Sequence, residues 1–433
     1  MGPLIARRGQ TIRRALGLFS LVWALGCGGA QVREAPQTPL QRARQALDQG
    51  RLSDAEAAIA ADADAGQREA VLLWAEIAMR GGRHADAIAR LRPLYQQAPT
   101  DLEVVTALAR AFDGAGEIDD AIARYADVLR QRPDDATSAL RFAELLLGRG
   151  DAALASAAAN AALRAHPKDA ALLAVAARAW LARGRVPQAR EAAMLATQAA
   201  PSAPAGWLEL ARVEIAAGER TAALSALLKV LALDGNHVQA LVMLGTLHLD
   251  ARRPAEAVAA LRRAAAIAAD DVAILNLLAV ALDAAGQPGE AVATLERAVQ
   301  VAPELPGLRR NLAEVLLTAG ELSRALTEAA QSVVMARRQA DESSRIRTDA
   351  EETLARCIVA HGLWRAACDS VGDAHAVRAA IVAALATHQL QLAPADIDRL
   401  ATELAPVVGP AVAACRKPPA LPGAVPPRGA STP

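Results

Sequence analysis

Cys357, His361 and Cys368 are the reactive side chains whose spacing comes nearest to a chemical site in this sequence. A cysteine beside a histidine can act as a nucleophilic pair, and cysteines together with histidine can hold zinc. Their spacing matches no zinc-binding pattern, and the sequence has no glycine-rich phosphate loop or nucleophile elbow. We therefore predict no catalytic residue, no metal site and no cofactor. A hydrolase that uses His361 and a cysteine stays as the weakest alternative.

The first 26 residues combine a basic segment with a short apolar run. Four arginines between residues 7 and 14 precede the run ALGLFSLVWALG at residues 15–26. The run is shorter than a membrane-spanning helix needs to be. A basic flank, a short apolar core and small residues at its end are typical of a secretory signal.

The apolar run ends in Ala24-Leu25-Gly26-Cys27, which resembles a bacterial lipoprotein box, although such boxes usually carry Leu where Ala24 stands. The resemblance implies that residues 1–26 are a signal peptide, that Cys27 is lipidated, and that residues 27–38 form a flexible tether to a membrane. An ordinary signal peptide followed by an incidental cysteine is the alternative.

Export also bears on the other cysteines. Cys357 and Cys368 flank a predicted turn near Gly362, and antiparallel helices would bring them together. Because exported proteins meet oxidising conditions, we predict that these two cysteines can form a disulfide; two buried thiols are the alternative. Cys415 would then remain unpaired.

The amino-acid composition indicates that the chain is helical, so helices must position the cysteines and the histidine. Hydrophobic residues make up 53% of the 433 residues and aromatic residues only 2%, so the apolar content is mostly alanine and leucine, which favour helices. A chain of this length exceeds one ordinary globular core, which points to several domains or an extended architecture. Lysine plus arginine and aspartate plus glutamate both total 47, and no basic excess predicts a nucleic-acid partner.

A period of 34 residues runs through most of the chain. Its turn position is occupied by Gly82, Gly116, Gly150, Gly184, Gly218, Arg252, Gly286 and Gly320. Alanine stands five residues after each turn position, and alanine or glycine stands seven residues before it. Glycine would end the first helix in a left-handed conformation, and the small residues would let two helices approach closely.

This helix–turn–helix period resembles the tetratricopeptide repeat (TPR) family. The resemblance implies an all-α fold, a right-handed superhelical α-solenoid of about ten TPR-like repeats. Residues 39–67 would form a degenerate N-terminal repeat and residues 68–337 eight repeats. An insertion and an atypical C-terminal repeat would follow at residues 338–372, a C-terminal helical cap at 373–415, and a disordered proline-rich tail at 416–433.

In the TPR family the first helices line a concave groove that holds a protein or peptide. Mapping the rows three, six and ten residues before each turn position predicts a groove lined by Leu140, Leu147, Arg178, Leu181, Leu208, Arg212, Ile215, Val242 and Leu249. We predict that this groove holds an amphipathic helix or an extended hydrophobic peptide. The lysine and asparagine pattern that clamps acidic C-terminal peptides is missing, apart from Asn276. The alternative is that the apolar side chains pack on neighbouring repeats.

Together the resemblances imply a non-catalytic interaction scaffold of the bacterial cell envelope. It would be a lipoprotein on the periplasmic face of the outer membrane that assists assembly of a secretion, pilus or polysaccharide-export machine. A periplasmic chaperone that holds hydrophobic peptides in the groove is the second interpretation. We expect neither a nucleic-acid partner nor a small-molecule substrate.

Overall fold

The structure is a computed structural model and describes residues 37–338, 344–361, 378–379, 381–383, 385–386 and 393–404. Within these residues the regular secondary structure is helical throughout, which confirms the predicted all-α solenoid fold. The predicted signal peptide, Cys27, Cys368, Cys415 and the proline-rich tail lie outside the described residues.

The chain divides into two units, of which the first ends at Pro133. Its helices are α1 (Pro39–Asp48), α2 (Leu52–Asp64), α3 (Arg68–Arg80), α4 (His84–Gln97), α5 (Leu102–Ala115) and α6 (Ile118–Gln131). Each helix packs against the next one along the chain. The six helices therefore form three consecutive hairpins. In each hairpin we call α1, α3 or α5 the first helix and α2, α4 or α6 the second helix.

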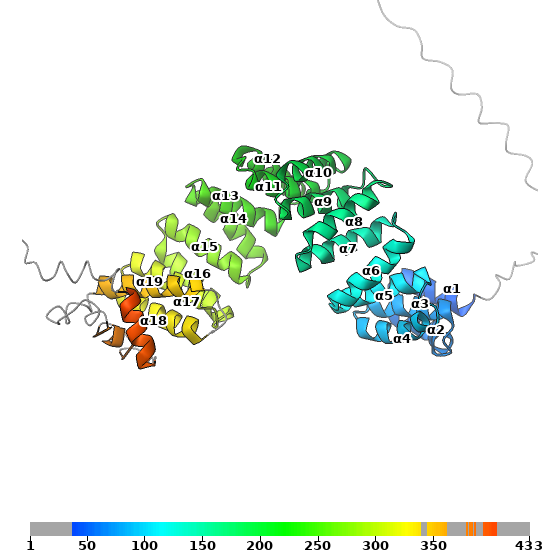
Figure 1. Cartoon of the computed structure of the whole chain (residues 1–433), viewed down its shortest axis with the longest axis horizontal. Helices are drawn as coiled ribbons and strands as arrows, with labels where there is room; N and C mark the ends of the chain where they lie inside the picture. The colour runs from blue at the N-terminus through cyan, green and yellow to red at the C-terminus, as the bar shows by residue number, and fades with distance from the viewer. Residues whose placement is uncertain are drawn as a thin grey trace, which may run out of the picture. The chain divides into compact units, whose positions relative to one another are not determined.

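The second unit begins at Asp134. Its helices are α7 (Ala136–Arg149), α8 (Ala152–Leu163), α9 (Ala170–Ala182), α10 (Val186–Ala199), α11 (Pro204–Ala216), α12 (Arg220–Leu233), α13 (Val238–Asp250), α14 (Pro254–Ile267), α15 (Val272–Ala284), α16 (Pro288–Val301), α17 (Pro306–Thr318), α18 (Leu322–Arg338) and α19 (Ser344–His361). Residues 394–404 form a further helical segment. Figure 1 shows the hairpins of this unit following one another in chain order, from α7 in green to α19 in orange.

The turn position of each repeat has the left-handed backbone that the sequence predicts. Seven of the eight predicted positions are glycines with φ between 70° and 90°. The eighth, Arg252, has φ 57° and is the one non-glycine residue with positive φ in the described chain. Because a side chain is disfavoured in this conformation, glycine marks the turns of the other repeats.

The two columns of small residues lie between the helices of each hairpin. All eight alanines that follow the turns are completely buried: Ala87, Ala121, Ala155, Ala189, Ala223, Ala257, Ala291 and Ala325. In the column before the turns, Gly245 approaches Leu261 so closely that a Cβ atom added to this glycine would lie 2.5 Å from Cγ of the leucine. The small side chains thus set the spacing between helices.

Leucines and other larger apolar residues fill the space that the small columns leave. The core of the C-terminal hairpins continues from Leu261 through Leu326 and Leu354 to Leu400 and Leu404. The helical segment at 394–404 therefore packs on the end of the solenoid and covers apolar side chains that no further repeat would bury.

Candidate functional site

The nine residues predicted to line a groove all lie on four first helices of the second unit. Leu140 and Leu147 come from α7, Arg178 and Leu181 from α9, Leu208, Arg212 and Ile215 from α11, and Val242 and Leu249 from α13. We call the solvent-facing surface of α7, α9, α11 and α13 the first-helix face. α9 contacts both α7 and α11, so the rows on these three helices are neighbours in space, and α13 shares a buried cluster with α11.

The apolar residues of the first-helix face differ in exposure. Ile215 is 38% exposed, whereas Leu140, Leu147, Leu181 and Val242 are half-buried. A half-buried leucine presents part of its surface to solvent and part to its own repeat. These side chains can therefore provide an apolar strip for another molecule while they also support the solenoid.

Three residues of the predicted set contribute to the core. Leu208 is only 7% exposed and belongs to the buried cluster shared by α11, α12, α13 and α14, which corrects the prediction that it faces a partner. Leu249 is half-buried and packs against the core of the C-terminal hairpins, and half-buried Val242 packs against the buried cluster of Leu241, Ala264 and Ile274. The row ten residues before the turn leans toward the core in this part of the solenoid, as the packing alternative proposed.

The two arginines of the predicted set share a carboxylate that the sequence analysis missed. Glu209 on α11 is 4% exposed and lies between Arg178 and Arg212. Its carboxylate oxygens lie 3.2 Å from Nε of Arg178 and 3.6 Å from Nε of Arg212. The side chains of Arg178 and Arg212 remain 43% and 30% exposed, so the acid is buried and the bases reach solvent.

Burial controls the titration of this carboxylate. Desolvation raises the pKa of Glu209 above its ordinary value, and the charges of Arg178 and Arg212 offset this effect only in part. One turn away, Glu214 is also buried, but Arg190 contacts both of its oxygens at 2.6 and 2.7 Å. Glu209 therefore lacks the complete pairing that its neighbour has.

Beyond α13, the corresponding surface changes character. On α15 and α17, polar residues at these rows accept hydrogen bonds from the next first helix: Asn276 accepts from Asn311 at 2.6 Å, and Glu314 accepts from Thr353 on α19 at 2.8 Å. Thr318 likewise donates to Asp283 at 2.7 Å. Because these polar groups already have hydrogen-bond partners, they are less available to bind another molecule than the arginines of the first-helix face.

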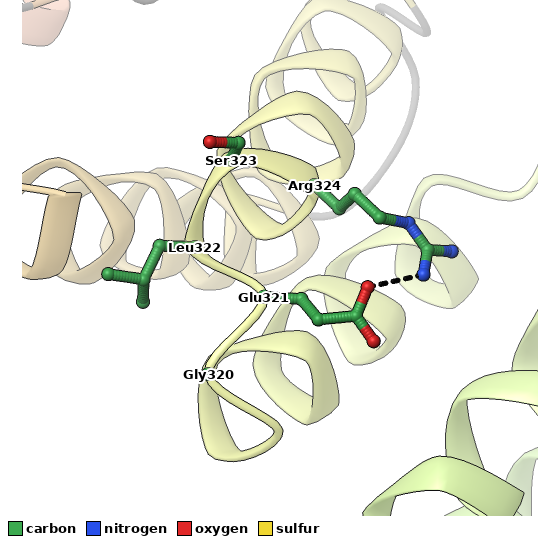
Figure 2. Close-up of a pocket in the computed structure, with 5 residues that line it drawn as sticks. All are labelled: Gly320, Glu321, Leu322, Ser323 and Arg324. Carbon is green, nitrogen blue, oxygen red and sulfur yellow. Dashed lines mark hydrogen bonds and ion pairs between the residues drawn. The ribbon is translucent and has the colours of Figure 1, made fainter.

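A separate hollow of about 480 Å³ lies at the turn between α17 and α18, lined by five consecutive residues from Gly320 to Arg324. Figure 2 shows Arg324 directed toward Glu321, with which it forms an ion pair at 2.5 Å. Arg324 also contacts Glu296 on α16. Two carboxylates thus pair with this one guanidinium, so Arg324 has no free positive charge to offer an anionic ligand in the hollow.

The predicted disulfide concerns residues that the structure describes only in part. Cys357 is completely buried with a free thiol, and burial raises its pKa to about 12. A thiol with such a pKa is a poor nucleophile at neutral pH. Cys368 and the side chain of His361 lie outside the described residues, so the disulfide stays a prediction.

Neither a metal cluster nor a membrane span stands out in the described part of the chain. No three His, Cys, Asp or Glu side chains there are grouped so that they could hold a metal ion. Among the same residues, no helix combines the length and apolar character that crossing a membrane requires.

Family models for the tetratricopeptide repeat match four segments of the chain, residues 78–142, 140–204, 208–272 and 282–341. Together these segments cover more than half of its length. The chain belongs to the tetratricopeptide repeat family. TPR proteins generally mediate interactions between proteins, and the TPR fold is typically a non-catalytic scaffold.

Several solved structures resemble parts of this chain at low sequence identity. A tetratricopeptide repeat protein from Parabacteroides merdae is 15% identical, with 56% of this chain and 97% of that chain covered and a TM-score of 0.48. The Cut9–Hcn1 hetero-tetramer of APC/C is 17% identical over 71% of this chain and 59% of that chain, with a TM-score of 0.47. A thermophilic TPR protein of Thermus thermophilus is 25% identical over 42% of this chain and 99% of that chain, with a TM-score of 0.37. A comparison with curated protein sequences finds no match.

Proposed function

We propose that this TPR protein is a non-catalytic scaffold that holds a protein partner on the first-helix face of α7–α13. The observation that carries the proposal is the contrast between two parts of the second unit. From α7 to α13 the face offers partly exposed apolar side chains and two solvent-reaching arginines, whereas polar side chains on α15–α19 bind one another. Apolar strips with a charged flank fit an amphipathic partner.

The proposal extends to a place in the bacterial envelope. Its support is the sequence: a basic and apolar N-terminal segment followed by Cys27, which resembles a lipoprotein box. We propose that lipidated Cys27 holds the repeats on the periplasmic face of the outer membrane. There the scaffold would assist assembly of a secretion, pilus or polysaccharide-export machine.

Site-specific photo-crosslinking in living cells tests this function. A photoreactive amino acid would replace Ile215, which is 38% exposed on the first-helix face, or Leu154, which is 56% exposed on the second helix α8 and serves as the control. We expect a small set of envelope proteins to crosslink from position 215 and not from position 154. Equal crosslinking from both positions, or none from 215, would contradict binding at this face.

Fractionation and the intact mass of the mature N-terminus test the anchor in the same cells. The proposal expects the protein in the outer-membrane fraction and a mass that corresponds to a chain beginning at lipidated Cys27. A soluble protein with an unmodified N-terminus would remove the anchor from the proposal and leave the protein-binding face to be judged by the crosslinks.

A periplasmic chaperone is the second candidate, because partly exposed leucines and Ile215 can also hold many different apolar segments. Crosslinks from position 215 to many unrelated unfolded proteins would favour the chaperone, and crosslinks to one stoichiometric partner would favour the scaffold. A hydrolase is the weakest candidate: it requires loss of function in a His361→Ala variant.

A further inference from the structure

The charges around Glu209 do not balance. Arg178 and Arg212 both form ion pairs with this one carboxylate, and no other acid pairs with either arginine in the interactions of the described residues. Nearby acids are engaged elsewhere: Glu144 pairs with Arg141 at 2.5 Å and Glu214 with Arg190 at 2.6 Å. The group of Arg178, Glu209 and Arg212, which we call the arginine pair site, therefore carries a net positive charge.

Hydrogen bonding in the arginine pair site is also incomplete. Oε2 of Glu209 and Nε of Arg212 are buried without a hydrogen-bond partner, because the 3.6 Å between them exceeds hydrogen-bond length. Each guanidinium has five N–H donors, and both side chains reach solvent. A second carboxylate placed between the two guanidiniums would accept several of these donors and balance the charge.

Apolar residues surround the site on the first-helix face. Leu181 and Ile215 lie three residues, or one helical turn, beyond the two arginines on the same helices. Leu147 on α7 and Val242 on α13 lie on the flanking first helices and are half-buried. A partner that covers this surface must present apolar side chains on both sides of its acidic group. The acidic residue of the partner therefore lies in the middle of an apolar segment and is not its terminal carboxylate.

We propose that the arginine pair site binds the side-chain carboxylate of an aspartate or glutamate in the middle of an apolar segment of a partner protein. Arg178 and Arg212 bind the acid, and buried Glu209 positions the two guanidiniums. This inference rests on the proposed function, because it names the chemistry of the partner at the same face.

Selection from a display library tests the inference with the full-length protein. The library presents random 12-residue peptides joined to the display carrier through their C-termini, so that no peptide has a free terminal carboxylate. On the wild-type protein we expect enriched peptides to share one aspartate or glutamate with apolar residues on both sides. On an R178Q/R212Q variant, enrichment of the acidic residue should fall about tenfold, because a charge-assisted hydrogen bond contributes at least that much to affinity.

Three further variants make the result specific. R178Q alone removes the 3.2 Å contact to Glu209 and keeps the 3.6 Å contact from Arg212, so it should lower the unfolding temperature and lose part of the acidic preference while the protein stays folded. R110Q is the matched control, because Arg110 is exposed at the same repeat position on α5; it should select the same peptides as wild type. L181S/I215S should lose the apolar preference on either side of the acid.

Each outcome has one meaning. Apolar peptides without an acidic residue, lost on L181S/I215S, would overturn the arginine pair site and leave the protein-binding face intact. Strong binders that appear only in a second library with free C-terminal carboxylates would overturn the internal-acid inference. No enrichment on the wild-type protein would contradict both the inference and the proposed function.

Discussion

At the scale of single residues, Glu209 and Arg252 depart from the repeat pattern in opposite ways. Glu209 is a carboxylate buried to 4% exposure where the solenoid usually places apolar or solvated side chains. Arg252 has φ 57° where the other repeats use glycine. Both departures should cost stability. Only the departure at Glu209 brings charged groups together on the candidate site, which is why we assign it a role in binding.

Glu209→Gln should stabilise the protein at neutral pH. Burial raises the pKa of Glu209 in the folded state, so its contribution to stability is greatest below the ordinary carboxyl value and is lost as pH rises through the raised value. Removing the charge should therefore increase the free energy of unfolding at pH 7 and change it much less near pH 4, below the ordinary carboxyl value. Urea unfolding at both pH values measures this, with exposed Glu191→Gln as control; a Glu209→Gln effect independent of pH would contradict it.

Arg252→Gly should also stabilise the protein. A non-glycine residue in the left-handed region is disfavoured by about 1–2 kcal/mol, and glycine removes this penalty. Glycine also increases the conformational entropy of the unfolded chain, which offsets part of the gain in stability. The net gain should be about 0.5–1 kcal/mol in the free energy of unfolding. Arg253→Gly is the matched control, because Arg253 has φ −116° and glycine relieves no strain there. Equal effects of the two substitutions would argue against backbone strain at Arg252.

At the scale of elements, the close approach of two helices can depend on a single glycine. Gly206 in the first turn of α11 faces the backbone of α10, where an added Cβ would lie 3.0 Å from atoms of Ala196 and Thr197. Gly307 in the first turn of α17 has open space around it. The two glycines occupy similar places in their helices but meet different packing.

This contrast predicts different effects of alanine at the two positions. Gly307→Ala should stabilise by up to about 1 kcal/mol through helix propensity. Gly206→Ala should be about 1–2 kcal/mol less favourable than Gly307→Ala, because the α10 backbone must shift to admit the methyl group. Thermal unfolding of the two variants tests this, and similar unfolding temperatures would mean that α10 and α11 separate without cost.

At the scale of the whole molecule, a solenoid depends on how its last repeat is covered. Arg337 on α18 is 7% exposed at its side chain and pairs with Glu351 on α19 at 2.5 Å. It also pairs with Glu403 at 3.1 Å and Asp396 at 3.6 Å, both in the segment 393–404. This one arginine thus joins α18, α19 and the final helical segment.

Arg337→Met should loosen the C-terminal end of the solenoid and leave its beginning unchanged. Removing one partner from a buried ionic group leaves unpaired charges and typically costs about 3–5 kcal/mol. Because each repeat contacts mainly its neighbours, hydrogen exchange should accelerate at 394–404 and in α19 but not in α1–α6. Uniform acceleration along the chain would show that the array unfolds as a single cooperative body.

The 34-residue period was sufficient to predict the helices, their turns and their small columns. Each of these features depends on residues within one hairpin: a left-handed turn requires glycine, and closely packed helices require alanine or glycine. Such local requirements repeat in every hairpin, so they can be recognised in a single sequence. The nine groove positions could be placed on first helices by the same reasoning.

The burial of individual residues in those rows was decided by the tertiary structure. Leu208 and Ile215 both stand in rows expected to face a partner, yet one is 7% exposed and the other 38%. Glu209 lies outside those rows, and nothing in its local sequence marks it as buried between two arginines. Exposure and charge pairing depend on how adjacent repeats pack, and that packing joins residues about one repeat apart, such as Arg178 and Glu209. A periodic sequence determines what each repeat is, whereas the packing between repeats determines which side chains remain available for binding.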